Sequence, residues 1–128
     1  MIVYITGTEY IDEINDETKY RIRNICRLGA HIVISNFSGF DKLALKFLRS
    51  IEYPHVTVYQ TINTESYGYP LKNVGNYPTQ NIEMSRIADY ILAIHNGTKE
   101  VGANIKRMPP SKVRIITVPR IARLRLVR

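Results

Sequence analysis

The chain of 128 residues is long enough for one domain with a single core and too short for two. Its composition, 45% hydrophobic and 23% charged, is that of an ordinary globular protein, and no apolar run approaches the roughly 20 residues that cross a bilayer, so we expect no membrane contact. The single cysteine, Cys26, excludes an internal disulfide, and the chain start lacks the basic and apolar parts of a signal peptide, so we expect a cytoplasmic location.

The net charge of +7 is concentrated at the C-terminal end. Residues 1–100 hold 10 Lys or Arg against 11 Asp or Glu, whereas residues 101–128 hold eight Lys or Arg and no acid. We therefore divide the chain into a domain of residues 1–118 and a basic tail of residues 119–128. Such a tail can bind nucleic acid, or it can dock on acidic groups of its own body or of a second subunit. Imperfect alternation of Arg with apolar residues over 121–128 predicts an edge strand that a second copy would cover, giving a homo-oligomer.

The first half of the chain predicts two strand–helix units. Residues 1–6 are rich in Ile, Val and Tyr, which is typical of a buried parallel strand. Apolar residues at spacings of three and four from Ile11 to Ile25 predict a helix, and Gly29 is placed to end it. Residues 31–35 predict the second strand. Asp41 then opens a second helix, whose expected buried stripe is Leu43, Ala44, Phe47, Leu48 and Ile51.

The second half continues the alternation of strands and helices. A third strand is expected over residues 55–60, and residues 61–78, which lack a hydrophobic period and hold four Gly or Pro, predict a long loop. A helix from Thr79 to about Asp89, burying Ile82 and either Met84 or Ser85, leads to a strand over residues 90–94, a short helix over 100–108 and a fifth strand over 112–118. This order predicts an α/β protein, a Rossmann-like three-layer fold with a mostly parallel five-stranded sheet.

Three turns rich in Gly, Ser and Thr directly follow three of the expected strands. The loops at the carboxyl ends of parallel strands gather at one edge of the sheet, where ligands bind. Backbone N–H groups and hydroxyls in such loops can approach phosphate or ribose oxygens closely. We therefore expect a nucleotide-like small molecule to bind here, and the candidate ligand-binding residues are Gly7, Thr8, Ser35, Asn36, Ser38, Gly39, Asp41, His95, Asn96, Gly97, Thr98 and Lys99.

Two features of these loops admit more than one interpretation. Asp41 can bind a ribose, or it can cap the helix that it opens, and the two roles are compatible. The long loop carries Tyr67, Tyr69 and Tyr77, whose rings can stack on a base or can pin the loop to the protein surface.

Glu9 is the candidate catalytic residue. A carboxylate at the end of the first strand could attack or stabilise the C1′ carbon of a ribose, as in N-glycoside chemistry. His95 could bond a phosphate or act as a base, but no second His, Cys or carboxylate stands at ligand spacing around it. We therefore predict no metal site and no cofactor.

The order of motifs resembles the SLOG superfamily, Rossmann-like domains that include LOG-type phosphoribohydrolases and DNA-processing protein A. The closest pattern is the small single-domain branch common in bacteria and their phages. The corresponding residues are Gly7-Thr8-Glu9, then Ser35 to Asp41, then Gln80-Asn81 with Met84 and Asp89, and finally Asn96-Gly97 with Gly102. Glu9 stands where the family has Arg, and the P-G-G-x-G-T motif of the phosphoribohydrolases is absent, which favours binding over hydrolysis.

Three hypotheses about function follow. The first is a protein that binds a nucleotide or a nucleotide-derived compound, such as one derived from NAD, as a sensor or sequestering protein; the resemblance implies a role in phage–host conflict. The second is an N-glycosidic hydrolase or transferase that acts on a nucleotide with Glu9 as the reactive carboxylate. The third is nucleic-acid binding through the basic tail.

Overall fold

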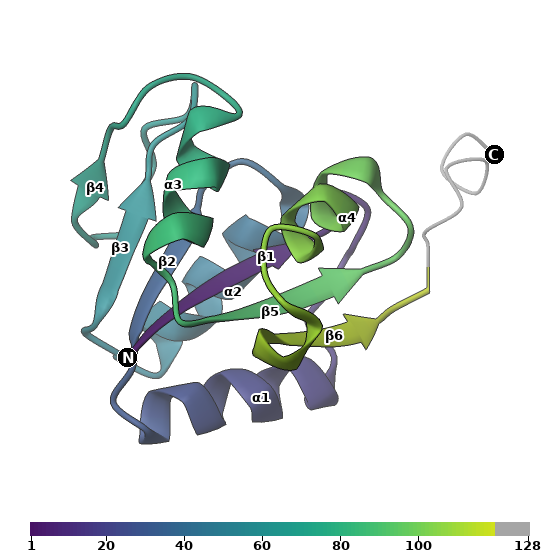
Figure 1. The fold of residues 1–128 in the computed structure, drawn as a ribbon. Coiled ribbons are helices and arrows are strands. Elements are labelled where there is room, and N and C mark those ends of the chain that lie inside the picture. The colour runs from purple at the N-terminus through teal and green to yellow at the C-terminus, as the bar shows by residue number, and fades with distance from the viewer. Residues whose placement is uncertain (120–128) are drawn as a thin grey trace, which may run out of the picture.

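Six parallel strands form the central sheet, and helices cover both of its faces (Figure 1). The computed structural model describes residues 1–119. The elements in chain order are β1 (Ile2–Gly7), α1 (Asp16–Arg27), β2 (His31–Ser35), α2 (Gly39–Ser50), β3 (Val56–Tyr59), β4 (Leu71–Lys72), α3 (Thr79–Ile87), β5 (Tyr90–His95), α4 (Lys99–Ile105), a 3-10 turn η1 (Pro110–Lys112) and β6 (Val113–Thr117).

The sheet order is β4-β3-β2-β1-β5-β6, which confirms the expected three-layer α/β fold and parallel sheet. The expected count of five strands is wrong by one, because β4 lies inside the predicted loop of residues 61–78. Its two residues, Leu71 and Lys72, pair with Val58 and Tyr59 of β3 at the edge of the sheet. The strand and the oligomer contact expected over residues 121–128, and all of the basic tail except Pro119, lie outside the described residues.

Alternation along the strands assigns each side chain to one face of the sheet. In β1, Val3 and Ile5 belong to a cluster shared with α1 and α2, whereas Tyr4 belongs to a second cluster shared with α3 and α4. Figure 1 shows α3 and α4 in front of the sheet and α2 behind it. The first cluster is the larger and includes Ile22, Phe40, Ala44, Leu45 and Leu48. The main core therefore lies between the sheet and the α1/α2 layer.

The first two helices begin where side chains can cap them. Asn15 accepts a hydrogen bond from the backbone N–H of Thr18 (2.8 Å), so α1 starts at Asp16 and not near Ile11 as the apolar spacing suggested. Helix α2 starts at Gly39, two residues before Asp41, with Ser38 as its N-cap. Its buried residues are Phe40, Asp41, Ala44, Leu45 and Leu48, so Leu45 replaces the half-buried Leu43 and Phe47 in the expected stripe.

The segment between β3 and α3 is held to the core near its middle by two tyrosines. Tyr69 is buried, and its hydroxyl donates a hydrogen bond to the Tyr53 carbonyl oxygen (2.7 Å) while the Arg49 guanidinium lies over its ring. Tyr67 packs against the same core. These two rings pin the loop, and Tyr77 is exposed at its far end.

Helix α3 presents an unusual buried face. Ile82, which the sequence placed in the core, is 48% exposed, and the buried residues are Gln80, Asn81, Met84 and Ser85. Three of these four side chains are polar, so this layer covers the sheet with hydrogen-bonding groups where an ordinary layer would place aliphatic ones. No helix within residues 1–119 has the length and apolar content that a membrane crossing requires.

Candidate functional site

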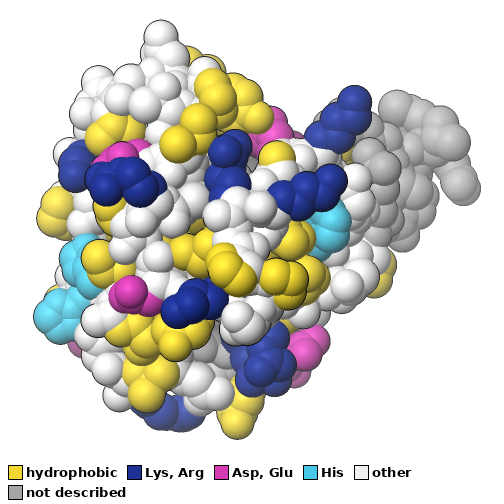
Figure 2. Space-filling model, viewed as in Figure 1, with side chains coloured by type: hydrophobic (Ala, Val, Ile, Leu, Met, Phe, Trp, Pro, Cys, Tyr) yellow, Lys and Arg dark blue, Asp and Glu magenta, His cyan; other side chains and the backbone are white. Residues whose placement is uncertain are grey.

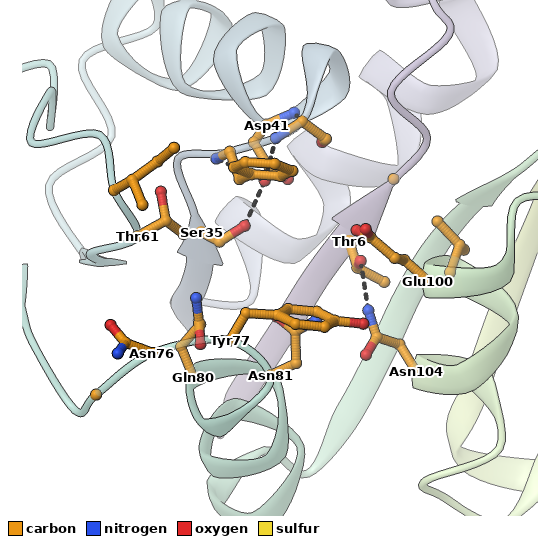
Figure 3. Close-up of a pocket in the computed structure, with 16 residues that line it drawn as sticks. Thr6, Ser35, Asp41, Thr61, Asn76, Tyr77, Gln80, Asn81, Glu100 and Asn104 are labelled. Atoms are coloured by element: carbon orange, nitrogen blue, oxygen red, sulfur yellow. Dashed lines mark hydrogen bonds between the residues drawn. The ribbon is translucent and has the colours of Figure 1, made fainter.

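A cavity of about 380 Å³ opens at the carboxyl ends of β1 and β2, on the face covered by α3 and α4 (Figure 3). Helices α1 and α2 carry the chain outward from β1 along one face, and α3 then returns it on the other face to β5, on the opposite side of β1. Open parallel sheets bind ligands in the crevice beside such a reversal. The volume falls within the range of small-molecule sites. The lining residues are Thr6, Gly7, Ser35, Phe37, Ser38, Asp41, Thr61, Ile62, Gly75, Asn76, Tyr77, Gln80, Asn81, Glu100, Val101 and Asn104.

Four of the residues that the sequence placed at the site line this cavity: Gly7, Ser35, Ser38 and Asp41. They come from the ends of β1 and β2 and from the start of α2. The other predicted ligand-binding residues lie outside the lining. They are Thr8, Asn36, Gly39, His95, Asn96, Gly97, Thr98 and Lys99.

Thr8 and Asn96 tie the loop after β1 to the loop after β5. The Thr8 hydroxyl donates a hydrogen bond to Asn96 Oδ1 (2.8 Å), and Asn96 Nδ2 donates to the Tyr10 carbonyl oxygen (3.3 Å). The backbone N–H of Phe40 donates to the Thr8 carbonyl oxygen (3.1 Å), which joins the start of α2 to the same cluster. These contacts fix the edge of the sheet from which the cavity opens.

Gly7 at the end of β1 and Gly39 at the start of α2 allow close packing. A Cβ atom on Gly7 would lie 2.2 Å from Cγ of the fully buried Phe40, and one on Gly39 would lie 2.6 Å from the Glu9 carbonyl oxygen. Both distances are far below van der Waals contact, so any side chain at either position would push α2 away from β1. Gly7 thus lets Phe40 pack against the end of β1, and Gly39 lets the start of α2 approach the backbone of Glu9.

Asn36 organises the segment that borders the cavity. Its Nδ2 donates hydrogen bonds to the carbonyl oxygens of Asn63 (2.7 Å) and Glu65 (2.8 Å), and its Oδ1 accepts one from the Thr61 hydroxyl (2.8 Å). Thr61 and its neighbour Ile62 line the cavity. Asn36 therefore acts on the cavity through the position of this loop.

Glu9 and the residues after β5 lie apart from the lining. Glu9 is exposed, and so is Lys99. His95 Nδ1 and Thr98 Oγ1 are buried without a hydrogen-bond partner within residues 1–119. The described structure therefore brings neither Glu9 nor His95 into the cavity wall.

Of the two roles left open for Asp41, the structure confirms the helix cap, and ribose binding stays a prediction. Its carboxylate accepts hydrogen bonds from Ser35 Oγ and from the backbone N–H groups of Phe37 (3.2 Å) and Ser38 (3.1 Å), and Ser38 Oγ accepts from the Asp41 N–H (3.0 Å). This is a capping box for α2. Burial outweighs these hydrogen bonds and raises the pKa of Asp41 to about 6. Asp41 thus caps the helix and also contributes to the cavity wall.

The sequence analysis missed the opposite wall, which α3 and α4 supply. Asn81 and Asn104 are anchored to β1, because Tyr4 Oη donates a hydrogen bond to Asn81 Oδ1 (3.3 Å) and Asn104 Nδ2 donates to Thr6 Oγ1 (3.0 Å). Gln80 is 3% exposed, and its Oε1 has no hydrogen-bond partner within the described chain. A buried polar group left without a partner costs about 1–3 kcal/mol. Figure 3 shows Gln80 extending from α3 toward Ser35 across the cavity.

The charge of the cavity is negative. Lys and Arg side chains lie on the outer surface of the α3/α4 face (Figure 2), but none of those within residues 1–119 lines the cavity. Its two ionisable acids are Asp41 in the wall and the exposed Glu100 at the start of α4, whose side chain points toward Thr6 (Figure 3). The remaining polar groups are hydroxyls and carboxamides, which bind uncharged polar ligands by hydrogen bonds.

Two aromatic rings border the cavity. Phe37 follows β2 and is 45% exposed, and Tyr77 precedes α3 and is 59% exposed. Exposed rings that border a cavity can stack on a flat ligand bound in it, because their apolar faces gain from that contact. Of the three loop tyrosines, Tyr77 is thus the one available for stacking.

Residues 1–119 hold no group of three or more His, Cys, Asp or Glu side chains that could bind a metal ion. Cys26 is half-buried in α1, and burial raises the pKa of its thiol to about 11, so it stays protonated at neutral pH. Cys26 is therefore not activated as a thiolate nucleophile in the described structure.

No family model matches the chain, and no curated protein and no solved structure matches it. The likeness to the SLOG superfamily therefore stays a prediction from the motifs. The function must be argued from the cavity itself.

Proposed function

We propose that the protein binds a nucleotide or a nucleotide-derived small molecule in the cavity at the carboxyl ends of β1 and β2, and that it acts as a sensor or sequestering protein. The observation that carries the proposal is the combination, in one cavity, of two exposed aromatic rings with the buried carboxamide of Gln80, whose Oε1 has no hydrogen-bond partner within residues 1–119. A nucleobase offers a flat π-face and a polar edge at once, and so fits both features.

The position of the cavity supports the same class of ligand. Parallel α/β sheets bind nucleotides at the carboxyl ends of their strands beside the point where the strand order reverses. Asp41 and Ser38 fix the start of α2 through the capping box, and Thr6 and Asn104 fix α4 against β1. The polar groups of the wall are thereby held in place before a ligand arrives, which lowers the entropic cost of binding.

The two other hypotheses draw no support from the described residues. Glu9 lies outside the cavity lining, so N-glycosidic cleavage with Glu9 as the reactive carboxylate stays a prediction. Nucleic-acid binding through the basic tail concerns residues 120–128, outside the described part of the chain. A role in phage–host conflict rests on the SLOG resemblance.

The test is a thermal-shift screen of nucleosides, mononucleotides, NAD and ADP-ribose against the protein and two variants. A ligand at 100 times its Kd stabilises the native state by about 2.7 kcal/mol, which raises the melting temperature by several degrees. Stacking of one base on one ring is worth about 1–3 kcal/mol, so Tyr77→Ala should weaken binding by about 5- to 150-fold.

The matched control is Tyr20→Ala, which removes a ring of similar exposure (57%) from α1, in the opposite helical layer. This variant should bind as the original protein does. If no compound in the screen shifts the melting temperature, or if Tyr77→Ala and Tyr20→Ala bind the ligand equally well, the proposal is wrong.

A further inference from the structure

We infer that the cavity selects the uncharged nucleoside part of its ligand, with the base against Phe37 and Tyr77, its edge bonded by Gln80 and the ribose hydroxyls by Glu100, and that it disfavours phosphate groups. This inference rests on the proposed function and narrows it to one class of ligand. The sequence-based expectation was that the Gly-, Ser- and Thr-rich loops approach phosphate or ribose oxygens, and this inference keeps only the ribose.

The charges of the lining carry the first step. Within residues 1–119 no Lys or Arg lines the cavity, and the acidic side chains that line it are the carboxyls of Asp41 and Glu100. Sites that bind phosphate through side chains use Arg or Lys, which supply charge-assisted hydrogen bonds. A phosphate in this cavity would instead face carboxylates, and such like-charge contact discriminates against a ligand.

Gln80 carries the second step. It is 3% exposed, its Oε1 has no partner within residues 1–119, and its side chain extends into the cavity (Figure 3). A carboxamide offers a donor and an acceptor side by side. The edges of nucleobases offer the complementary pair, as Gln contacts with adenine show in other proteins. A base edge in the cavity would therefore face a carboxamide whose Oε1 has no partner within residues 1–119.

Glu100 carries the third step. Its side chain points toward Thr6 at the end of β1 (Figure 3), at the carboxyl edge of the sheet. Carboxylates at this edge of nucleotide-binding sheets accept hydrogen bonds from ribose hydroxyls. An acid in this place favours a free diol and repels a phosphate group bonded near it.

The decisive experiment is titration calorimetry with adenosine, guanosine, cytidine, uridine and their 5′-mono- and 5′-triphosphates, at two salt concentrations. Repulsion in the cavity predicts that the preferred nucleoside binds about tenfold or more tightly than its triphosphate at low salt. Raising NaCl from about 50 mM to about 500 mM should narrow this gap, because salt screens the repulsion. If Lys or Arg side chains attracted the phosphates, the triphosphate would bind more tightly than the nucleoside at low salt, and its affinity would fall as salt is added.

Two variants localise the effect. Glu100→Gln keeps the shape of the side chain and removes its charge, so the ratio of the triphosphate Kd to the nucleoside Kd should fall several-fold. Glu17→Gln removes the same charge from the exposed first turn of α1, in the opposite helical layer, and should leave the gap unchanged.

The outcomes separate this inference from the proposed function. Triphosphates that bind more tightly, or nucleosides and nucleotides that bind equally at both salt concentrations, would overturn the inference and leave nucleotide binding intact. Absence of binding across the whole panel would overturn both. A nucleoside preference that Glu100→Gln and Glu17→Gln alter equally would remove Glu100 from the account.

Discussion

The face of the sheet covered by α1 and α2 and the face covered by α3 and α4 are packed in different ways. On the first, the residues that α1 and α2 bury are mainly aliphatic or aromatic and belong to the main core. On the second, α3 buries three polar residues beside Met84, and α4 buries Asn104 beside Val101. Apolar burial is the main favourable contribution to folding. The contrast indicates that one layer supplies most of the stability, while the other accepts weaker packing in order to form a polar cavity.

The largest expected effect tests the source of stability. Leu45 is fully buried in the main core, so Leu45→Ala should lower the free energy of unfolding by about 2–5 kcal/mol, measured by urea denaturation. Ile82 on α3 is 48% exposed although its sequence context suggested a core position, so Ile82→Ala should change stability by less than about 0.5 kcal/mol. Comparable losses in the two variants would contradict the division of roles between the layers.

The next effect concerns Asp41, which α2 holds against the cavity. The folded-state pKa of about 6 lies above the ordinary value of 3.8 because the carboxyl is buried. At pH above 6 the native state bears the full cost of a buried charge, and below pH 3.8 the carboxyl is neutral in both states and the cost is absent. The protein should therefore gain up to about 3 kcal/mol of stability from this group as pH falls from 7 to 4.

The comparison with Asp41→Asn isolates this contribution from other titrating groups. Urea denaturation at several pH values should show the stability of the original protein rising relative to that of the variant between pH 6 and pH 4. If the difference in unfolding free energy between the two proteins stays constant over this range, or if the original protein loses stability relative to the variant, then the hydrogen bonds from Ser35, Phe37 and Ser38 outweigh burial.

The sequence predicts those elements of the fold that have a local signal and misses those that depend on distant contacts. Strands β1, β2 and β5 are nearly continuous apolar runs, and β3 and β6 are rich in Val and Ile, so these five strands were located to within one or two residues. Strand β4 was missed, because two residues carry no periodicity and their pairing with β3 depends on the path of the whole loop. The start of α1 was placed too early, because Ile11 and Ile14 continue its apolar spacing although the Asn15 cap begins the helix after them.

One wall of the candidate site could be predicted from the sequence and the other could not. The wall formed by Gly7, Ser35, Ser38 and Asp41 follows from a local rule, since residues directly after parallel strands share one edge of the sheet. The α3 wall does not, because Gln80 in a short amphipathic segment looks like part of a solvated face, and the apolar Ile82 suggested the wrong buried side. Gln80 and Asn81 were noted only as motif positions. The spacing of four from Gln80 to Met84 was the one available indication that they share a face.

The smallest expected effect concerns two buried oxygen atoms, one in each helical layer, and distinguishes a role in binding from a role in stability. Thr18 Oγ1 on α1 and Gln80 Oε1 on α3 are both buried without a hydrogen-bond partner in residues 1–119. Replacing either side chain by an apolar one of similar shape removes an unsatisfied group, so Thr18→Val and Gln80→Met should each raise stability by about 1 kcal/mol, measured by urea denaturation. The two variants should then differ in function, because Gln80 faces the cavity and Thr18 lies in the layer that packs the main core.

Stabilisation by the nucleoside should persist in Thr18→Val and be lost in Gln80→Met. If Gln80→Met retains the ligand-induced shift, the unpaired carboxamide is a defect of packing and not a recognition group. If Gln80→Met instead loses stability without ligand, then Gln80 supports the packing of α3 on the sheet, and the contrast between the two layers is smaller than the buried side chains indicate.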